Sequence, residues 1–292
     1  MRDEEKSLLR YVCFGNLEKA RTQAKIILEN SGTKKDESFC KEMLCRLNAQ
    51  SRFIELPSNL KWMLVVEDLE NFHEGKYLPR EQEINVADKV LAIYKAADKL
   101  AQIGLHYVPA IILHGESGCG KTELARYIAY RAGLPFAYVR FSALVSSLLG
   151  NTQANLSRIF DYVRDAPCVL CFDELDAIGL ARGQSSDVGE MSRIVIALMQ
   201  ELDRCPNNII LVGMTNRFDR LDPALVRRFS LQYEVQRLSP AEAAELAQRI
   251  FRYSDLEADI CPVCYIEAVP ASAVVKDCIE AIVSHVAKQA AS

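Results

Sequence analysis

The sequence predicts an α/β fold in which a parallel sheet carries helices on both faces. Two observations predict it. Short apolar segments of strand length alternate with helical segments through the middle of the chain, as in parallel strands joined by crossover helices. A glycine-rich turn also separates the first strand from the helix that follows it. The expected strands are Ala110–His114, Phe136–Phe141, Val169–Phe172, Ile209–Met214 and Leu231–Val235, with helices over Val86–Ile103 and from Lys121, Asn155 and Met191.

The rest of the chain divides into three further parts around this domain, which we place at residues 81–238. Residues 1–50 have apolar positions three and four apart and predict a small helical unit, which we interpret as a recognition unit. Residues 51–80 contain two prolines and are expected to be a linker or the edge of the next domain. Residues 239–292 predict a small helical domain, opened at Ser239–Glu242 by a capping box with proline at the first helical position.

Composition excludes several partner classes. The 292 residues are 50% hydrophobic and carry a formal net charge of -4, which gives no general electrostatic attraction to nucleic acid or to an anionic membrane. No apolar segment has membrane-spanning length, and the charged N-terminus does not resemble a signal peptide. The ten cysteines are scattered through expected helices and strands, as buried free thiols are. We therefore expect a cytoplasmic protein with no membrane or nucleic-acid partner.

A complete phosphate-loop motif follows the first strand. Residues 115–122 fit the pattern G-x-x-x-x-G-K-[S/T], the Walker A motif, between a strand and a helix. Its glycines let backbone N–H groups converge on phosphates at the positive end of the helix. Lys121 is expected on the β and γ phosphates of ATP and Thr122 on Mg²⁺. The expected nucleotide-binding residues of this loop are Gly115, Glu116, Ser117, Gly118, Cys119, Gly120, Lys121 and Thr122.

Two later strands end in polar residues that suit hydrolysis. The strand Val169–Phe172 is followed by Asp173, a hard oxygen ligand for Mg²⁺, and by Glu174, which would polarise a water towards the γ-phosphate. The next expected strand, Ile209–Met214, is followed by Thr215 and then by the polar residue Asn216. If that strand lies between the other two, Asn216 can hydrogen-bond the attacking water or the γ-phosphate.

Two adjacent arginines follow a short helix later in the chain. Arg227 and Arg228 cannot easily reach the phosphates of their own subunit, but from a neighbour they would stabilise transition-state charge as arginine fingers. The alternative is an ordinary pair of surface salt bridges.

The segment Ile111–Val235 resembles the module of AAA+ ATPases. It contains GESGCGKT, CFDELDAI and MTNRFDRLDPALVRRF in that order and at that spacing, and its RRF ending most resembles the group of spastin, katanin and short bacterial relatives. The resemblance implies a homo-oligomeric ring, usually a hexamer, with Mg²⁺ and ATP between subunits and a helical lid over Ser239–Ser292. It places the seven residues argued above, Lys121, Thr122, Asp173, Glu174, Asn216, Arg227 and Arg228, on the family's functional positions.

The sequence departs from the family at three places. Glu116 replaces a common proline in the phosphate loop, and no arginine stands near Ala273, where some branches contact the γ-phosphate from the lid. In Ser146–Gly150, which aligns with the loop that grips a threaded polypeptide, Leu148 replaces the usual aromatic residue. An aliphatic side chain would hold a polypeptide more weakly than an aromatic one. The sequence therefore supports ATP hydrolysis better than it supports threading of a polypeptide.

Two cysteine features have competing interpretations. Cys261 and Cys264 form a single C-x-x-C, which Cys278 and His285 would have to complete as a zinc site, but the spacing fits ordinary lid cysteines better. Cys119 lies at a positive helix end beside Lys121, which favours its thiolate.

The leading functional hypothesis is an oligomeric ATPase that couples hydrolysis to remodelling or translocation of a protein partner recruited by the N-terminal helices. The alternative is an ATP-gated assembly switch that activates or positions an effector protein without threading it. A loader of nucleic-acid enzymes is disfavoured by the acidic balance. A small-molecule kinase would need neither Asn216 nor the arginine pair.

Overall fold

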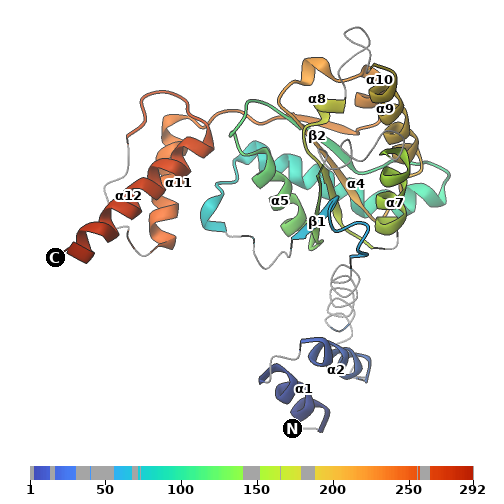
Figure 1. The fold of residues 1–292 in the computed structure, drawn as a ribbon, viewed down its shortest axis with the longest axis horizontal. Helices are drawn as coiled ribbons and strands as arrows, with labels where there is room; N and C mark the ends of the chain where they lie inside the picture. The colour runs from blue at the N-terminus through green and yellow to red at the C-terminus, as the bar shows by residue number, and fades with distance from the viewer. Residues whose placement is uncertain are drawn as a thin grey trace. The chain divides into compact units, whose positions relative to one another are not determined.

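The structure is a computed structural model that describes residues 3–13, 17–30, 40, 56–67, 72, 74–140, 152–164, 166–178, 188–254, 256 and 264–291. It divides into two compact units, Met1–Pro57 and Ser58–Ser292 (Figure 1). Among the described residues, no helix is both long enough and apolar enough to span a membrane.

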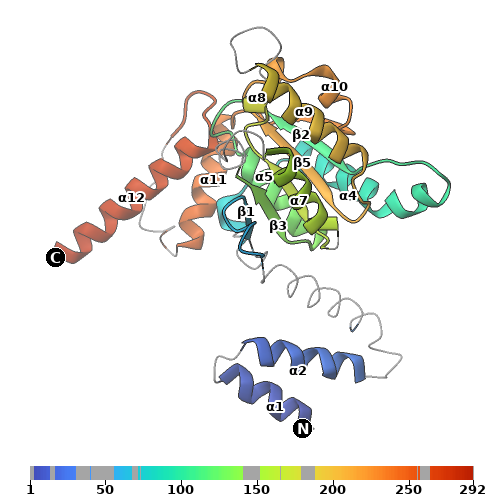
Figure 2. The same ribbon diagram turned by 45° about the vertical axis from the view of Figure 1, so that its right-hand side comes forward.

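The first unit contains two packed helices, α1 (Asp3–Cys13) and α2 (Leu17–Asn30), which form an antiparallel hairpin (Figure 2). On α1, Leu9 and Val12 are more than half exposed although they are apolar. The sequence also predicts a third helix around Lys41 to Leu47, and these residues lie outside the described part of the chain.

The second unit is built on a six-stranded sheet of order β1-β3-β4-β5-β2-β6. Its strands are β1 (Leu64–Glu67), β2 (Ala110–His114), β3 (Phe136–Val139), β4 (Val169–Phe172), β5 (Ile210–Thr215) and β6 (Leu231–Glu234). All neighbouring pairs are parallel except β1 with β3. The expected α/β fold with a parallel sheet is confirmed. Strand β5 lies between β4 and β2, which is the arrangement that the interpretation of Asn216 required.

Strand β1 lies within the segment 51–80, for which the sequence predicted a linker or a domain edge. Leu64 is buried and pairs with Val139, so part of this segment is an edge of the sheet. No alternation of apolar and polar residues distinguishes a strand there, because Leu64–Glu67 is short and follows the half-exposed Trp62. Strands β2 and β4 have the expected ends, and the ends of β3, β5 and β6 differ from the expected ones by one or two residues.

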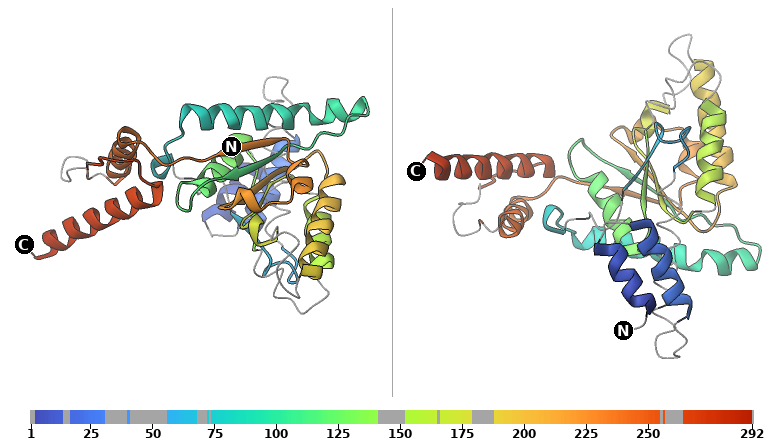
Figure 3. Two further views of the ribbon diagram at one scale, coloured as in Figure 1. Left: turned by 90° about the horizontal axis from the view of Figure 1, so that it is seen from above. Right: turned by 60° about the horizontal axis from the view of Figure 1, so that its bottom comes forward.

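Helices cover both faces of the sheet (Figure 3). On one face α4 (Glu81–Gln102) packs against α5 (Lys121–Ala132), and both contribute to a core with alternate residues of the central strands. On the other face α7 (Thr152–Arg164) packs against α9 (Val188–Asp203). Because helices cover both faces, the central strands are apolar along almost their whole length.

The remaining short helices lie in the connections of this unit. They are η2 (Glu74–Lys76), α8 (Leu175–Ile178), η3 (Phe218–Arg220) and α10 (Pro223–Val226).

The C-terminal part of this unit, here called the lid, contains α11 (Pro240–Tyr253) and α12 (Ala271–Ala291). The predicted capping box is present, since the Ser239 hydroxyl accepts from the Glu242 amide and the Glu242 carboxylate accepts from Ser239. The two helices share a small core that includes Leu246 and Val274.

Candidate functional site

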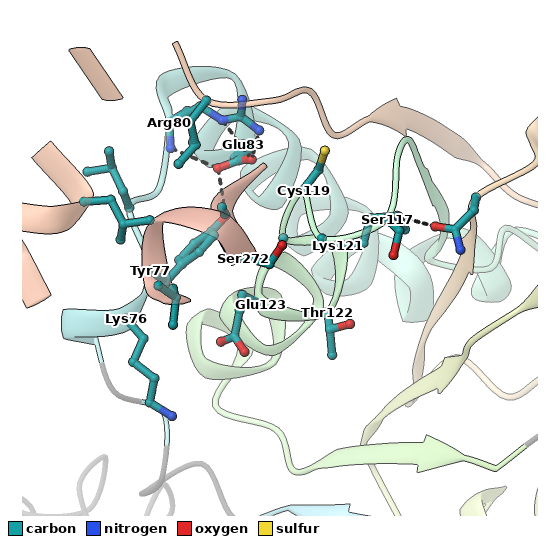
Figure 4. A pocket seen from close by; sticks show the side chains of 18 of the residues that line it. Lys76, Tyr77, Arg80, Glu83, Ser117, Cys119, Lys121, Thr122, Glu123 and Ser272 are labelled. Carbon is teal, nitrogen blue, oxygen red and sulfur yellow. Dashed lines mark hydrogen bonds and ion pairs between the residues drawn. The ribbon is translucent and has the colours of Figure 1, made fainter. Parts of the chain in front are cut away.

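A cavity of about 470 Å³ lies where the carboxyl ends of the central strands meet the lid (Figure 4). Its walls come from the phosphate loop, the residues after β4 and β5, the segment that precedes α4, and the start of α12. Such a crevice at the carboxyl ends of parallel strands is the usual place for a ligand in an open α/β sheet.

The phosphate loop has the backbone that its glycines permit. Gly115, Gly118 and Gly120 have φ values of 137°, 80° and 105°. A side chain at Gly115 would also meet the Val235 carbonyl oxygen at 2.4 Å, and one at Gly118 would meet the Ser272 hydroxyl at 2.2 Å. Glycine is therefore required both for the turn and for close contact with neighbouring chain segments.

Lys121 is the centre of the polar part of the cavity. Its ammonium donates to the Gly115 and Glu116 carbonyl oxygens at 2.9 and 2.8 Å and to Asn216 Oδ1 at 2.7 Å. Burial lowers the pKa of Lys121, because desolvation disfavours the charged form. The structure thus brings together the expected phosphate-binding lysine and the expected water-orienting asparagine.

Asp173 and Glu174 follow β4 and also line the cavity. Asp173 Oδ2 accepts from the Tyr138 hydroxyl at 3.2 Å, and Oδ1 accepts from the Glu174 amide at 2.8 Å. Glu174 has a φ of 53°, which is unusual for a residue with a side chain. Such strained backbone at the end of a strand is often found where a side chain must be aimed at a reacting group.

The oxygen donors here suit Mg²⁺. The Thr122 hydroxyl and the Asp173 carboxylate line the same cavity, beside backbone N–H groups that suit phosphates. Mg²⁺ is usually held by one or two protein oxygens together with water and phosphate, so this sparse donor set fits it. Within the described part of the chain, no group of three or more His, Cys, Asp or Glu residues could hold a metal by itself. Cys261, one of the cysteines weighed for zinc, lies outside that part.

The expectation that Cys119 favours its thiolate is wrong for this structure. Cys119 is only 3% exposed, and burial raises the pKa of its thiol more than the nearby Lys121 lowers it. The cost of desolvating the thiolate exceeds the favourable field of Lys121.

The two arginines do not line the cavity. Arg228 makes a two-pronged ion pair with Asp203 at 2.9 and 3.0 Å and also donates to the Ala224 carbonyl oxygen. Arg227 is exposed. The role of the two arginines as fingers for a neighbouring subunit stays a prediction.

Glu116, the residue that replaces the family's proline, has a specific partner. Arg237, at the start of the connection to the lid, donates to its carboxylate at 2.7 Å. Both side chains are about half exposed or more, so this ion pair contributes little stability. Its position matters more, since it joins the phosphate loop to the base of the lid.

Sequence reasoning missed the segment Lys76–Glu83. Lys76, Tyr77 and Leu78 line the cavity opposite the phosphate loop, and Leu238 and Leu246 extend the apolar wall. Arg80 and Glu83 also line the cavity, and buried Glu83 accepts from the Tyr77 hydroxyl at 2.9 Å and from the Arg80 side chain at 3.0 Å. The sequence feature that could have indicated this wall is the apolar pair Tyr77 and Leu78 before Pro79. Two residues are too few to distinguish a cavity wall from a linker.

The residue Leu148 and the whole segment Ser146–Gly150 lie outside the described residues.

Comparison with known proteins identifies the central domain. Residues 111–237 match the family described as ATPase family associated with various cellular activities (AAA). The AAA family ATPase y4kL of Sinorhizobium fredii is 38% identical over 136 residues, which are 47% of this chain and 41% of that protein. The peroxisomal ATPase pex6 of Schizosaccharomyces pombe is 41% identical over 130 residues, which are 42% of this chain and 14% of that protein. The chain spans less than half the length of either relative. The narrower grouping with spastin and katanin stays a prediction.

Proposed function

Because residues 111–237 form an AAA ATPase domain, we propose that this chain hydrolyses ATP with Mg²⁺ in a ring of identical subunits and uses the energy to remodel or translocate a protein partner. The observation that carries the proposal is the cavity in which Lys121, Asn216 and the Asp173–Glu174 pair meet.

The two ends of the cavity suit the two ends of ATP. The apolar wall formed by Leu78, Leu238 and Leu246 would bury the base, while Ser117–Thr122 would receive the phosphates. To bind, the γ-phosphate would compete with Asn216 and the loop carbonyl oxygens for the Lys121 ammonium. A phosphate dianion is a stronger acceptor than a neutral amide, so this exchange favours binding.

The residues that follow the strands would then have separate roles in hydrolysis. Glu174 would take a proton from the attacking water, and Asn216, released from Lys121, would orient that water or the γ-phosphate. Mg²⁺ held at Thr122 and Asp173 would neutralise charge on the phosphate oxygens. These roles need water to reach Glu174, whose side chain is exposed in this unit.

Stabilisation of the transition state would also involve the two arginines that follow α10. Arg227 is exposed, Arg228 is partly exposed, and neither lines the cavity. In a ring of subunits they would reach the ATP of a neighbour and stabilise the negative charge of its transition state. We therefore propose a homo-hexamer in the cytoplasm, with the two N-terminal helices as the unit that recruits a protein. The apolar and exposed Leu9 and Val12 are suitable contact residues on that unit.

The ATP-gated switch remains the second candidate because Leu148 replaces the expected aromatic residue. A remodeller that threads its partner should depend on Leu148, whereas a switch should not. Leu148→Ala is expected to impair work on a partner more than basal hydrolysis if the protein threads. Equal partner-dependent activity in the variant and the wild type would favour the switch.

One experiment tests the proposal most directly. Glu174→Gln should bind ATP without hydrolysing it and so trap the assembled state, whose mass and co-purifying proteins can be measured with ATP present. Lys121→Ala is the matched control, because it should not bind ATP and should not assemble on its own. Glu174→Gln that stays monomeric with saturating ATP would contradict the ring.

A further inference from the structure

We propose that Tyr138 is a positioning residue for Asp173, and that its hydroxyl sets the carboxylate orientation needed for the Mg²⁺ of the bound nucleotide. This inference rests on the proposed function. It concerns a residue on β3, a strand to which the sequence assigned no functional side chain.

The strands place Tyr138 beside Asp173. Strands β3 and β4 are parallel neighbours in which Tyr138 pairs with Cys171, two residues before Asp173. Residues two apart on a strand point to the same face, so Asp173 continues the face on which Tyr138 lies. The Tyr138 hydroxyl accordingly reaches Asp173 Oδ2 at 3.2 Å.

Asp173 is held at both oxygens. Oδ2 accepts from Tyr138, and Oδ1 accepts from the Glu174 amide at 2.8 Å. Together the two bonds fix the rotation of the carboxylate. Each carboxylate oxygen can accept more than one hydrogen bond, so both retain capacity for Mg²⁺ or its water ligands. The bond to the Glu174 amide also involves the residue with the unusual φ of 53°, so the same carboxylate supports the backbone of the proposed base.

The tyrosine ring is anchored independently of its hydroxyl. Tyr138 packs against the core beneath α4 and α5, which includes Phe136 and Cys171. Tyr138→Phe therefore removes the hydrogen bond and retains the packing. Tyr233, on β6, packs against the same core and does not line the cavity, so Tyr233→Phe is a matched control.

The experiment measures binding rather than turnover. The affinity of each full-length protein for a fluorescent ADP analogue is determined in EDTA and then at increasing MgCl₂. In EDTA, Tyr138→Phe should bind the analogue as the wild type does, which also shows that the phosphate loop is folded. The MgCl₂ concentration at which binding is half enhanced should rise about tenfold, as when an outer partner of a metal ligand is removed. Tyr233→Phe should match the wild type.

A double-mutant cycle separates positioning from a general structural effect. If Tyr138 acts through Asp173, adding Tyr138→Phe to Asp173→Asn should cause no further change in the MgCl₂ midpoint. A shift that persists in the Asp173→Asn background, or a Tyr138→Phe midpoint equal to that of the wild type, would overturn the inference alone. A wild-type protein that does not bind the analogue, or binds it without regard to Mg²⁺, would overturn the proposed function and this inference together.

Discussion

Tyr77 and Leu78 are adjacent in the chain, yet their side chains pack into two different hydrophobic cores. Tyr77 belongs to the core of the sheet domain, where its ring lies 5.3 Å from that of Tyr127. Leu78 belongs to the core of the lid, together with Leu246. Both residues line the cavity, so a nucleotide there would contact the junction between the two cores. The Arg249 side chain strengthens this junction from the lid by donating to the Tyr77 carbonyl oxygen at 3.0 Å.

We expect Leu78→Ala to weaken both nucleotide binding and the attachment of the lid. Removing a buried leucine side chain costs about 2–5 kcal/mol, and Leu78 is only 8% exposed. The affinity for ATP should fall at least tenfold, and hydrogen exchange in α11 should accelerate. Leu105→Ala is the control, because Leu105 is 55% exposed and lies outside the cavity. Wild-type affinity and exchange in Leu78→Ala would show that this junction does not couple the lid to the nucleotide.

Lys121→Ala and Glu174→Gln should separate binding from turnover. Lys121 is the cation that Asn216 and the loop carbonyl oxygens surround, so its removal should abolish nucleotide binding. Glu174→Gln keeps the size of the side chain but cannot take a proton, so binding should remain while hydrolysis falls by about 10²–10⁴-fold. Calorimetry and phosphate release measure the two properties. Near-normal hydrolysis by Glu174→Gln would remove Glu174 as the base.

Hydrolysis should rise more steeply than linearly with protein concentration, because the arginines act on a neighbour's ATP. Mixing Arg228→Ala subunits with Lys121→Ala subunits should restore some activity, since each supplies what the other lacks. An arginine finger contributes about 10³–10⁵-fold in rate. To act in this way Arg228 would have to exchange Asp203 for a phosphate, whereas the exposed Arg227 makes no ion pair with another residue in the described part of the chain. Activity per subunit that stays constant down to monomeric protein would contradict the shared site.

The sequence predicted those parts of the fold in which the local residue pattern matches the environment that the folded protein provides. The central strands are apolar along almost their whole length because helices cover both faces, and the motif glycines have backbone angles that other residues avoid. Lys121, Asp173 and Asn216 could be placed together because parallel strands end at the same edge. Strand β1 could not be predicted, since a four-residue edge strand has almost no pattern.

Contacts between segments that are distant in the sequence could not be predicted from local patterns. Tyr138 meets Asp173 across 35 positions, and Arg237 meets Glu116 across 121, so no local spacing reveals either pair. The error over Cys119 has the same origin. Proximity to Lys121 can be read along the chain, but the burial that raises the thiol pKa depends on how the surrounding segments pack.

The last prediction concerns alkylation of Cys119. Its sulfur lies in the cavity wall, so a maleimide adduct there would obstruct nucleotide entry and inhibit the ATPase. Mg²⁺ with ATP should protect the enzyme from alkylation, and Cys119→Ala should be active and resistant to the maleimide.

Because burial raises the pKa of this thiol, the reactive thiolate is scarce at neutral pH, and the inactivation rate should rise about tenfold per pH unit. That rise should continue above about pH 8.5, where an ordinary thiol would begin to level off. The other nine cysteines are internal controls, and mass spectrometry identifies the modified one. Inhibition that persists in Cys119→Ala, or that ATP does not slow, would assign the effect to another cysteine.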